Sequence, residues 1–257
     1  MRITFLGQGD SLGTPRVYCE CEVCEEARST GRNRRFRSSL WIETEGEEPL
    51  LLDCGPDFRT QMEQLGERFV GKGLLTHAHF DHIGGMVEWA DACRWRDSYA
   101  DVFGPREVLD EVRARFPWLE SRLRMKDNDG GMSYGEWTIY PWKVNHGKNG
   151  YSYAYRFEHS ATGRAWAYCS DSINLNAKEK EPLNGLNLLI LGTSYVVEPF
   201  PMETRSLYDM KEGLLLVAEV GAETALFTHL SHDVDVRRNY GLPNHVKLAE
   251  TGMKVDV

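Results

Sequence analysis

Residues 76–82 read Thr76-His77-Ala78-His79-Phe80-Asp81-His82, which places three histidines and one aspartate within six consecutive positions. Imidazole nitrogens and carboxylate oxygens are the ligands that zinc, manganese and iron accept in proteins. His77 and His79 are two positions apart, so both side chains can point the same way from an extended segment. Asp81 and His82 follow where the chain turns into a predicted helix, and they can face a second position. The segment therefore predicts ligands for two adjacent metal ions.

The histidine segment follows a short predicted strand, and other polar clusters along the chain also follow strands. Such loops, held by a rigid scaffold, are where catalytic residues concentrate. Mixed strands and helices indicate a layered α/β fold, and we expect one domain over residues 1–257. The predicted strands are Met1–Leu6, Ser38–Glu43, Pro49–Leu52, Gly73–Leu75, Trp137–Val144, Tyr151–Phe157, Ala165–Tyr168, Leu186–Leu191 and Thr224–Phe227. The predicted helices are Asp57–Gln64, a segment after His82, Arg106–Arg115 and Tyr208–Val220.

The length and composition of the chain argue against a disordered, a membrane-spanning or a secreted protein. The chain has 257 residues, and its seven Trp, eleven Tyr and ten Phe supply enough apolar surface for a sizeable core. No run approaches the roughly 18 apolar residues that a membrane span requires. The opening MRITFLGQGD turns polar after six residues, whereas a secretory signal would stay apolar for longer. We therefore expect a cytoplasmic protein without a membrane partner.

Four further motifs follow predicted strands in a characteristic order. They are Asp53-Cys54-Gly55, Asn145-His146, Ser170-Asp171 and Thr228-His229. Together with the HxHxDH string of residues 77–82, they resemble the signature of the metallo-β-lactamase fold hydrolases over essentially the whole chain. Each motif alone is weak, and the order of all five carries the resemblance.

The resemblance implies a fold and a set of ligands. The fold is an αββα sandwich with a dinuclear metal site at one edge of the β-sandwich. One metal would be held by His77, His79 and His146, and the other by Asp81, His82 and His229. Asp171 would bridge the two ions, and Asp53 would orient a ligand histidine through a hydrogen bond. The ions themselves could be Zn²⁺, Mn²⁺ or Fe²⁺.

Three cysteines, Cys19, Cys21 and Cys24, crowd into six residues, while the other three cysteines are scattered. Three thiolates lack one ligand for a closed tetrahedral zinc site, and His232 is the candidate for the fourth. Unligated thiols and a redox role are the alternatives. A subgroup of cyclic phosphodiesterases from carbon–phosphorus lyase pathways is similar, because it combines such a triplet with a terminal Thr-His-x-Ser-His.

Two adjacent metals would lower the pKa of a shared water and neutralise charge on a substrate. With the subgroup resemblance, this favours hydrolysis of a small cyclic or nucleotide-like phosphodiester, with Asp81 as a candidate base. Arg37, in the basic run of residues 32–37, is expected to position a loop or an anion near the site. The subgroup has a histidine where this chain has Arg205. An arginine stays charged, so we expect Arg205 to bind a phosphate or leaving oxygen instead of donating a proton.

Three other functions remain open. The first is a tRNA 3′-end endonuclease, but the net charge of -9 argues against a long nucleic acid partner. The second is a carbonyl-ester hydrolase such as a lactonase or thioesterase. The third is a metal-binding module without turnover. The resemblance also suggests a homodimer.

Overall fold

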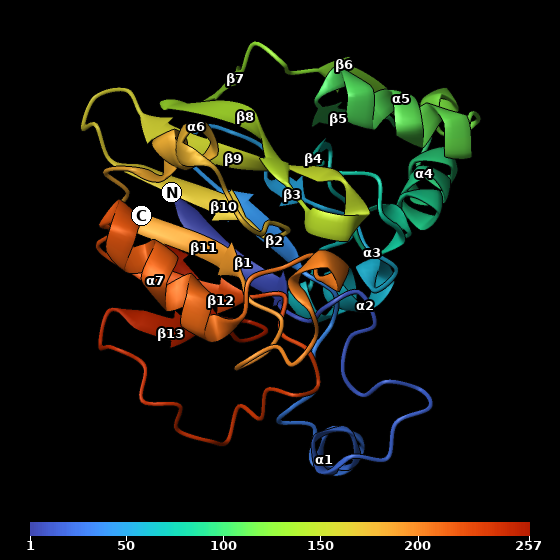
Figure 1. Cartoon of the computed structure of the whole chain (residues 1–257). Helices are drawn as coiled ribbons and strands as arrows, with labels where there is room; N and C mark the ends of the chain where they lie inside the picture. The colour runs from blue at the N-terminus through green and yellow to red at the C-terminus, as the bar shows by residue number, and fades with distance from the viewer.

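The computed structural model describes all of residues 1–257, and two seven-stranded sheets packed face to face form its centre (Figure 1). The first sheet has the order β14 (Lys254–Asp256), β1 (Arg2–Gly7), β2 (Ser39–Glu43), β3 (Leu50–Leu52), β4 (Lys72–Leu74), β5 (Ala100–Gly104), β6 (Leu123–Asp127). The second has the order β13 (Val246–Leu248), β12 (Ala225–Thr228), β11 (Leu188–Gly192), β10 (Ala165–Cys169), β9 (Tyr151–His159), β8 (Trp137–Asn145), β7 (Met132–Tyr134).

Each sheet changes from antiparallel to parallel pairing near its centre. In the first sheet β14, β1, β2 and β3 pair antiparallel, and β3 to β6 pair parallel. In the second sheet β7 to β10 pair antiparallel, and β10 to β13 pair parallel. Parallel strands end at the same edge, so the loops that follow them come together there.

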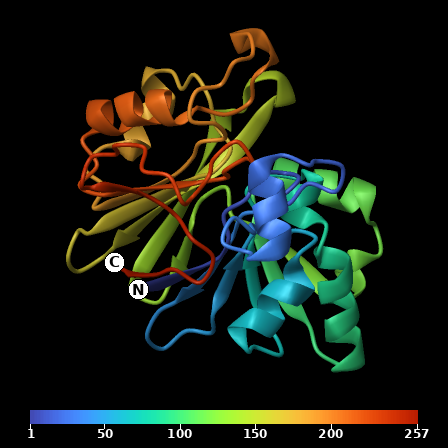
Figure 2. The same ribbon diagram turned by 90° about the horizontal axis from the view of Figure 1, so that it is seen from below.

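Helices cover the outer face of each sheet (Figure 2). The first sheet carries α2 (Phe58–Leu65), α3 (Phe80–Ile83), α4 (Met86–Trp95), α5 (Arg106–Arg115) and the short η1 (Leu119–Ser121). The second carries α6 (Ala177–Lys180), η3 (Glu181–Leu183) and α7 (Met210–Val220), while η2 (Gly147–Asn149) and η4 (Met202–Thr204) lie in its loops. Helix α1 (Glu22–Ser29) lies apart from both layers, at the bottom of Figure 1. None of the helices combines the length and apolar character needed to cross a bilayer.

Three apolar clusters hold these four layers together. A cluster of 18 buried residues draws on both sheets, with Phe5 and Leu40 from one and Phe157 and Trp166 from the other. Two outer clusters join the sheets to their helices: 21 residues include Trp89 of α4, and 22 residues include Leu216 of α7. The predicted αββα sandwich is therefore confirmed.

The strands predicted from the sequence are all present, with ends that differ by at most two residues, and Arg106–Arg115 is a helix with the predicted bounds. Helix α7 begins at Met210 instead of Tyr208, because Asp209 caps it and accepts a 2.9 Å hydrogen bond from the Glu212 amide. The elements that were not predicted are short or polar: β5, β6, β7, β13, β14, α1, α6 and the 3₁₀ helices η1 to η4.

Candidate metal centre

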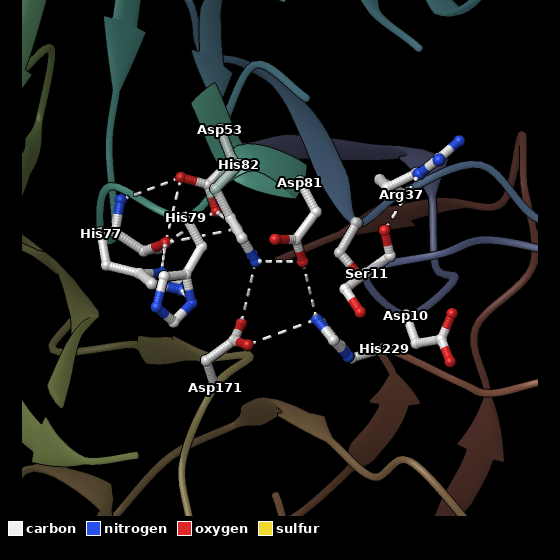
Figure 3. A network of polar contacts seen from close by, with 12 residues as sticks. Asp10, Ser11, Arg37, Asp53, His77, His79, Asp81, His82, Asp171 and His229 are labelled. Atoms are coloured by element: carbon white, nitrogen blue, oxygen red, sulfur yellow. Dashed lines mark hydrogen bonds and ion pairs between the residues drawn. The ribbon is translucent and has the colours of Figure 1, made fainter. Parts of the chain in front are cut away.

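Five strand ends bring the predicted side chains to one edge of the sandwich. Figure 3 shows Asp53, His77, Asp171 and His229 among them. Asp53 follows β3, His77 follows β4, His146 follows β8, Asp171 follows β10 and His229 follows β12. All five side chains are buried. The structure thus brings together residues that lie up to 176 positions apart in sequence (229 − 53).

His77, His79 and His146 form the first group, with one ligand atom from each lying within 4.8 Å of the others. The His77 Nε2 and His79 Nδ1 atoms are 2.8 Å apart, and His146 donates from Nδ1 to the Ser206 carbonyl at 2.8 Å. That bond leaves His146 Nε2 to face the group. Desolvation is the largest influence on all three imidazoles and lowers their pKa values, which favours the neutral form that binds metal ions.

Asp81, His82 and His229 form the second group. The Asp81 Oδ2 atom lies 3.2 Å from His82 Nε2 and 3.5 Å from His229 Nε2. Asp81 and His82 come from α3, which starts directly after His79 of the first group. The short helix is what turns these two side chains toward the second position, as the sequence predicted.

Asp171 lies between the two groups. Its Oδ1 is 3.3 Å from His229 Nε2 and 3.7 Å from His146 Nε2, and its Oδ2 is 3.3 Å from His82 Nε2. Burial disfavours the ionised carboxyl, but the surrounding imidazoles lower the pKa of Asp171 below its ordinary value. One carboxylate therefore reaches nitrogens of both groups.

The donor atoms fit divalent metal ions. Two ligands of one tetrahedral ion, each about 2.1 Å from it, lie about 3.4 Å apart. This matches the separations of 3.2 to 3.7 Å around Asp81 and Asp171, while the 2.8 Å between His77 Nε2 and His79 Nδ1 is shorter. Several of these buried atoms also have no hydrogen-bond partner: His82 Nε2, both ring nitrogens of His229, and Asp171 Oδ2. Buried polar atoms normally have one, so the atoms are arranged for another kind of partner.

Asp53 is hydrogen-bonded to His82, which is one of the predicted ligand histidines. Its Oδ2 accepts from His82 Nδ1 at 2.7 Å, and its Oδ1 accepts from the Thr76 amide at 2.9 Å. Asp53 has φ +60°, so the chain turns sharply here. Gly55 is required two residues later, since a Cβ there would lie 2.1 Å from the Asp81 carbonyl oxygen. With Nδ1 as the donor, Nε2 of His82 is the atom that faces Asp81 and Asp171.

Two contributors to the site were missed. The Thr76 hydroxyl donates to Asp53 at 2.9 Å and lies 3.0 Å from His77 Nδ1. The Ser206 carbonyl accepts from His146. Thr76 stands directly before the histidine motif, which is a usable signal. The contact of a backbone carbonyl does not depend on the residue type, so the sequence does not predict it.

The cysteine triplet does meet His232. Its Nδ1 lies 3.2, 3.5 and 3.4 Å from the sulfurs of Cys19, Cys21 and Cys24. This is a four-donor set of the type that holds structural zinc. The other nitrogen, Nε2, lies 2.9 Å from Arg16 Nη1, a contact that suits an unprotonated Nε2. A zinc ion on Nδ1 would require Nε2 to carry the proton, so Arg16 would have to move away.

Arg205 does not have the predicted environment. Its side chain is 6% exposed, and its guanidinium is bound to Glu212 through two hydrogen bonds and paired with Glu198 at 3.2 Å and Asp209 at 3.9 Å. Three carboxylates already neutralise its charge. The prediction that Arg205 binds a substrate oxygen is therefore corrected: the residue is part of a buried ion-pair network.

Arg37 fixes a loop beside the second group. It donates from Nη1 to Asp57 at 3.1 Å and from Nε to the Ser11 carbonyl at 3.3 Å. Figure 3 shows this contact between Arg37 and Ser11, to the right of Asp81. Of its two predicted roles, the contacts support holding a loop.

Comparison with known proteins agrees with this geometry. The sequence model of the family described as "Beta-lactamase superfamily domain" matches residues 49–230. A crystal structure of a new diphosphatase from the PhnP family is 26% identical with a TM-score of 0.86, covering 100% of this chain and 97% of that one. Zn²⁺-bound PqqB from Methylobacterium extorquens, at 16% identity and a TM-score of 0.81 over all of both chains, shares the fold.

Among curated sequences, an octanoyltransferase of Porphyromonas gingivalis is 29% identical over 99% of this chain but over only 51% of its own length. Coenzyme PQQ synthesis protein B of Methylobacterium radiotolerans is 31% identical over 44% of this chain and 40% of its own. The chain thus spans about half the length, or less, of these relatives.

Proposed function

Because the chain belongs to the beta-lactamase superfamily, with a family match over residues 49–230, we propose that it is a metal-dependent hydrolase of a small phosphodiester. The observation that carries the proposal is the place of Asp171, whose two oxygens lie near nitrogens of both histidine groups. A carboxylate between two such groups is the arrangement that a pair of ions sharing one ligand requires.

We assign the ligands as two sets. His77, His79 and His146 would hold one divalent ion, and Asp81, His82 and His229 the other, with Asp171 shared. When bound, two such ions supply Lewis acidity, lower the pKa of water and stabilise charge that develops on a phosphoryl group. The ions could be Zn²⁺, Mn²⁺ or Fe²⁺, since this donor set discriminates weakly among them.

The chain's own side chains would keep these ligands in place. Asp53 holds the Nδ1 proton of His82, and the Ser206 carbonyl holds that of His146. Both bonds leave Nε2 as a lone-pair donor. Both histidine contacts of Asp81 use its Oδ2, so its Oδ1 is our candidate to take a proton from the attacking water.

Two observations favour phosphodiesters over carbonyl esters. The relative that is 26% identical over the whole chain is a diphosphatase. The Cys19, Cys21, Cys24 and His232 cluster also matches the phosphodiesterase subgroup in the sequence, and we propose that it holds a structural Zn²⁺. The net charge of -9 disfavours a long nucleic acid but not a small phosphate ester.

Location and assembly stay predictions. A cytoplasmic protein that acts on a small molecule is consistent with the absence of a membrane-crossing helix, which by itself excludes only a helical span. The homodimer and the single domain over residues 1–257 likewise remain expectations.

A panel of four substrates in Mn²⁺-supplemented buffer tests the proposal. It contains a cyclic phosphate, a linear phosphodiester, a lactone and a precursor tRNA. We expect turnover of one or both small phosphodiesters, and little of the lactone or the tRNA. Preference for the lactone would replace the proposal with a carbonyl-ester hydrolase, and preference for the tRNA with an endonuclease. No turnover of any substrate by a protein that binds two ions would favour a module without this activity.

A further inference from the structure

Residues 205–209, which we call the strap, form hydrogen bonds with both of the loops that carry His146 and Asp171. On one side, the Ser206 carbonyl accepts from His146 Nδ1 at 2.8 Å, and the Arg205 carbonyl accepts from the Lys148 amide at 3.0 Å. On the other, the Tyr208 amide donates to the Ser172 carbonyl at 3.1 Å, directly after Asp171. The strap therefore contacts a ligand of the first group and the loop of the shared carboxylate.

The fit of the strap against the His146 loop is close. Gly147 has φ +57°, and a Cβ there would lie 2.1 Å from the Arg205 carbonyl oxygen. Only glycine combines that backbone conformation with such an approach. Displacing the strap by a fraction of an ångström would therefore move the carbonyl that orients His146.

Arg205 holds the strap in its place. Its guanidinium pairs with Glu198 before the strap, Asp209 at its end and Glu212 in the first turn of α7. Asp209 and Glu212 also form the capping box of that helix, which fixes their positions. Without the cation, three carboxylates that are largely or partly buried would repel one another, and the charge would be uncompensated.

We propose that Arg205 is a positioning residue for the first metal group: it acts through the strap and the Ser206 carbonyl on His146. The inference rests on the proposed two-metal function. It differs from the substrate contact predicted from the sequence, because the guanidinium serves a ligand's orientation and touches no substrate. Outer partners of this kind typically change metal affinity by about 10- to 100-fold.

The test compares Arg205→Met with a matched control, Arg156→Met. Arg156 also pins a loop, since its guanidinium donates to the Pro182 and Asn184 carbonyls at 2.6 and 2.9 Å, but it lies in mid-strand β9 away from the ligands. Mn²⁺ is titrated into each protein, and electron paramagnetic resonance distinguishes an exchange-coupled ion pair from isolated ions. Unfolding midpoints are recorded alongside.

We expect the wild type and Arg156→Met to form the coupled pair at the same Mn²⁺ concentration. Arg205→Met should bind the ion of the second group normally and the ion of the first group about 10- to 100-fold more weakly. Isolated ions should therefore dominate at intermediate Mn²⁺ concentrations. If Arg205→Met does not fold, Arg205→Lys, which keeps the charge but loses the forked geometry, should show an intermediate weakening.

Two outcomes would overturn the inference, and they are distinguishable. A wild type that never forms a coupled pair contradicts the proposed function and the inference with it. A wild type that forms the pair, together with an arginine variant that binds both ions as tightly as Arg156→Met does, contradicts the inference alone. In that second case Arg205 would serve stability only.

Discussion

Asp171 shows how a single ordinary residue gains its role from its neighbours. Its carboxylate is buried among three histidines that come from three different segments, helix α3 and the loops after β8 and β12. Nothing in Ser170-Asp171 marks it locally, and only the order of the surrounding motifs predicted its position. The HxHxDH histidines were predictable from their local sequence alone, because four ligand-type residues in six positions are rare.

Changing Asp171 to Ala should reduce turnover by more than about 100-fold, beyond what the loss of a residue that only orients a ligand costs. The reason is that both groups lose the oxygen that they share. Steady-state hydrolysis of the preferred phosphodiester measures the effect. Asp101→Ala is the control, since Asp101 of β5 forms ion pairs with Arg124 and Lys126 of β6, outside the centre. Turnover retained in the Asp171 variant would exclude the carboxylate as a shared ligand.

Arg205 shows where inference from single residues fails. Its place in the motif order predicted a substrate contact, whereas Glu198, Asp209 and Glu212 enclose it. Those three acids are unremarkable in the sequence, and what brings them together is the path of the loop into α7. The Ser206 carbonyl could not be predicted at all, because every residue has one.

At the level of elements, hydrophobic pattern decided what was predictable. Alternating or wholly apolar runs such as β8, β9 and β11 were predicted, and β8 ends directly before His146 of the centre. Strand β6, with the sequence LRMKD, is mostly exposed, and β14 is three residues long at the edge of its sheet. Such strands are defined by pairing with a neighbour, a long-range contact that local pattern does not contain. Helix α1 is short and rich in glutamate, and it contains Cys24 of the cysteine cluster.

The cysteine loop and the strand end after β12 form one structural unit. His229 and His232 are three residues apart, so a zinc ion on His232 would anchor the segment that also carries a ligand of the second group. The Leu230 amide between them donates to the Gln8 carbonyl at 2.7 Å, and the Asp10 amide donates back at 3.1 Å. Closing a loop of more than 200 residues should contribute substantially to stability.

Cys21→Ser should therefore lower the free energy of unfolding by about 2–5 kcal/mol, the range for losing a cross-link between distant segments. Activity per folded molecule should change less. Chemical denaturation and active-site titration measure the two quantities, with Cys93→Ala as a control for the loss of a buried thiol outside the cluster. Unchanged stability together with lost activity would instead assign the cluster to catalysis or redox chemistry.

At the scale of the whole molecule, each of the two sheets contributes part of the candidate metal centre. The first sheet contributes Asp53 and the residues of the HxHxDH segment, and the second contributes His146, Asp171 and His229. Neither group of ligands is complete in one sheet, since His146 completes the first and His229 the second. Packing of the 18-residue cluster between the sheets therefore sets the distance between donors. A net charge of -9 is compatible with an anionic substrate, because two divalent ions would make the centre itself positive.

Counting metal ions per chain by elemental mass spectrometry tests the central claim most directly. Protein supplied with Zn²⁺ and Mn²⁺ should hold about three ions, because the structure offers two His/Asp groups and one Cys₃His group. Mild chelation should remove the pair at the His/Asp centre first and leave one Zn²⁺ at the cysteines. A stoichiometry of one ion or none, in protein that is folded and supplied with both metals, would contradict a dinuclear hydrolase.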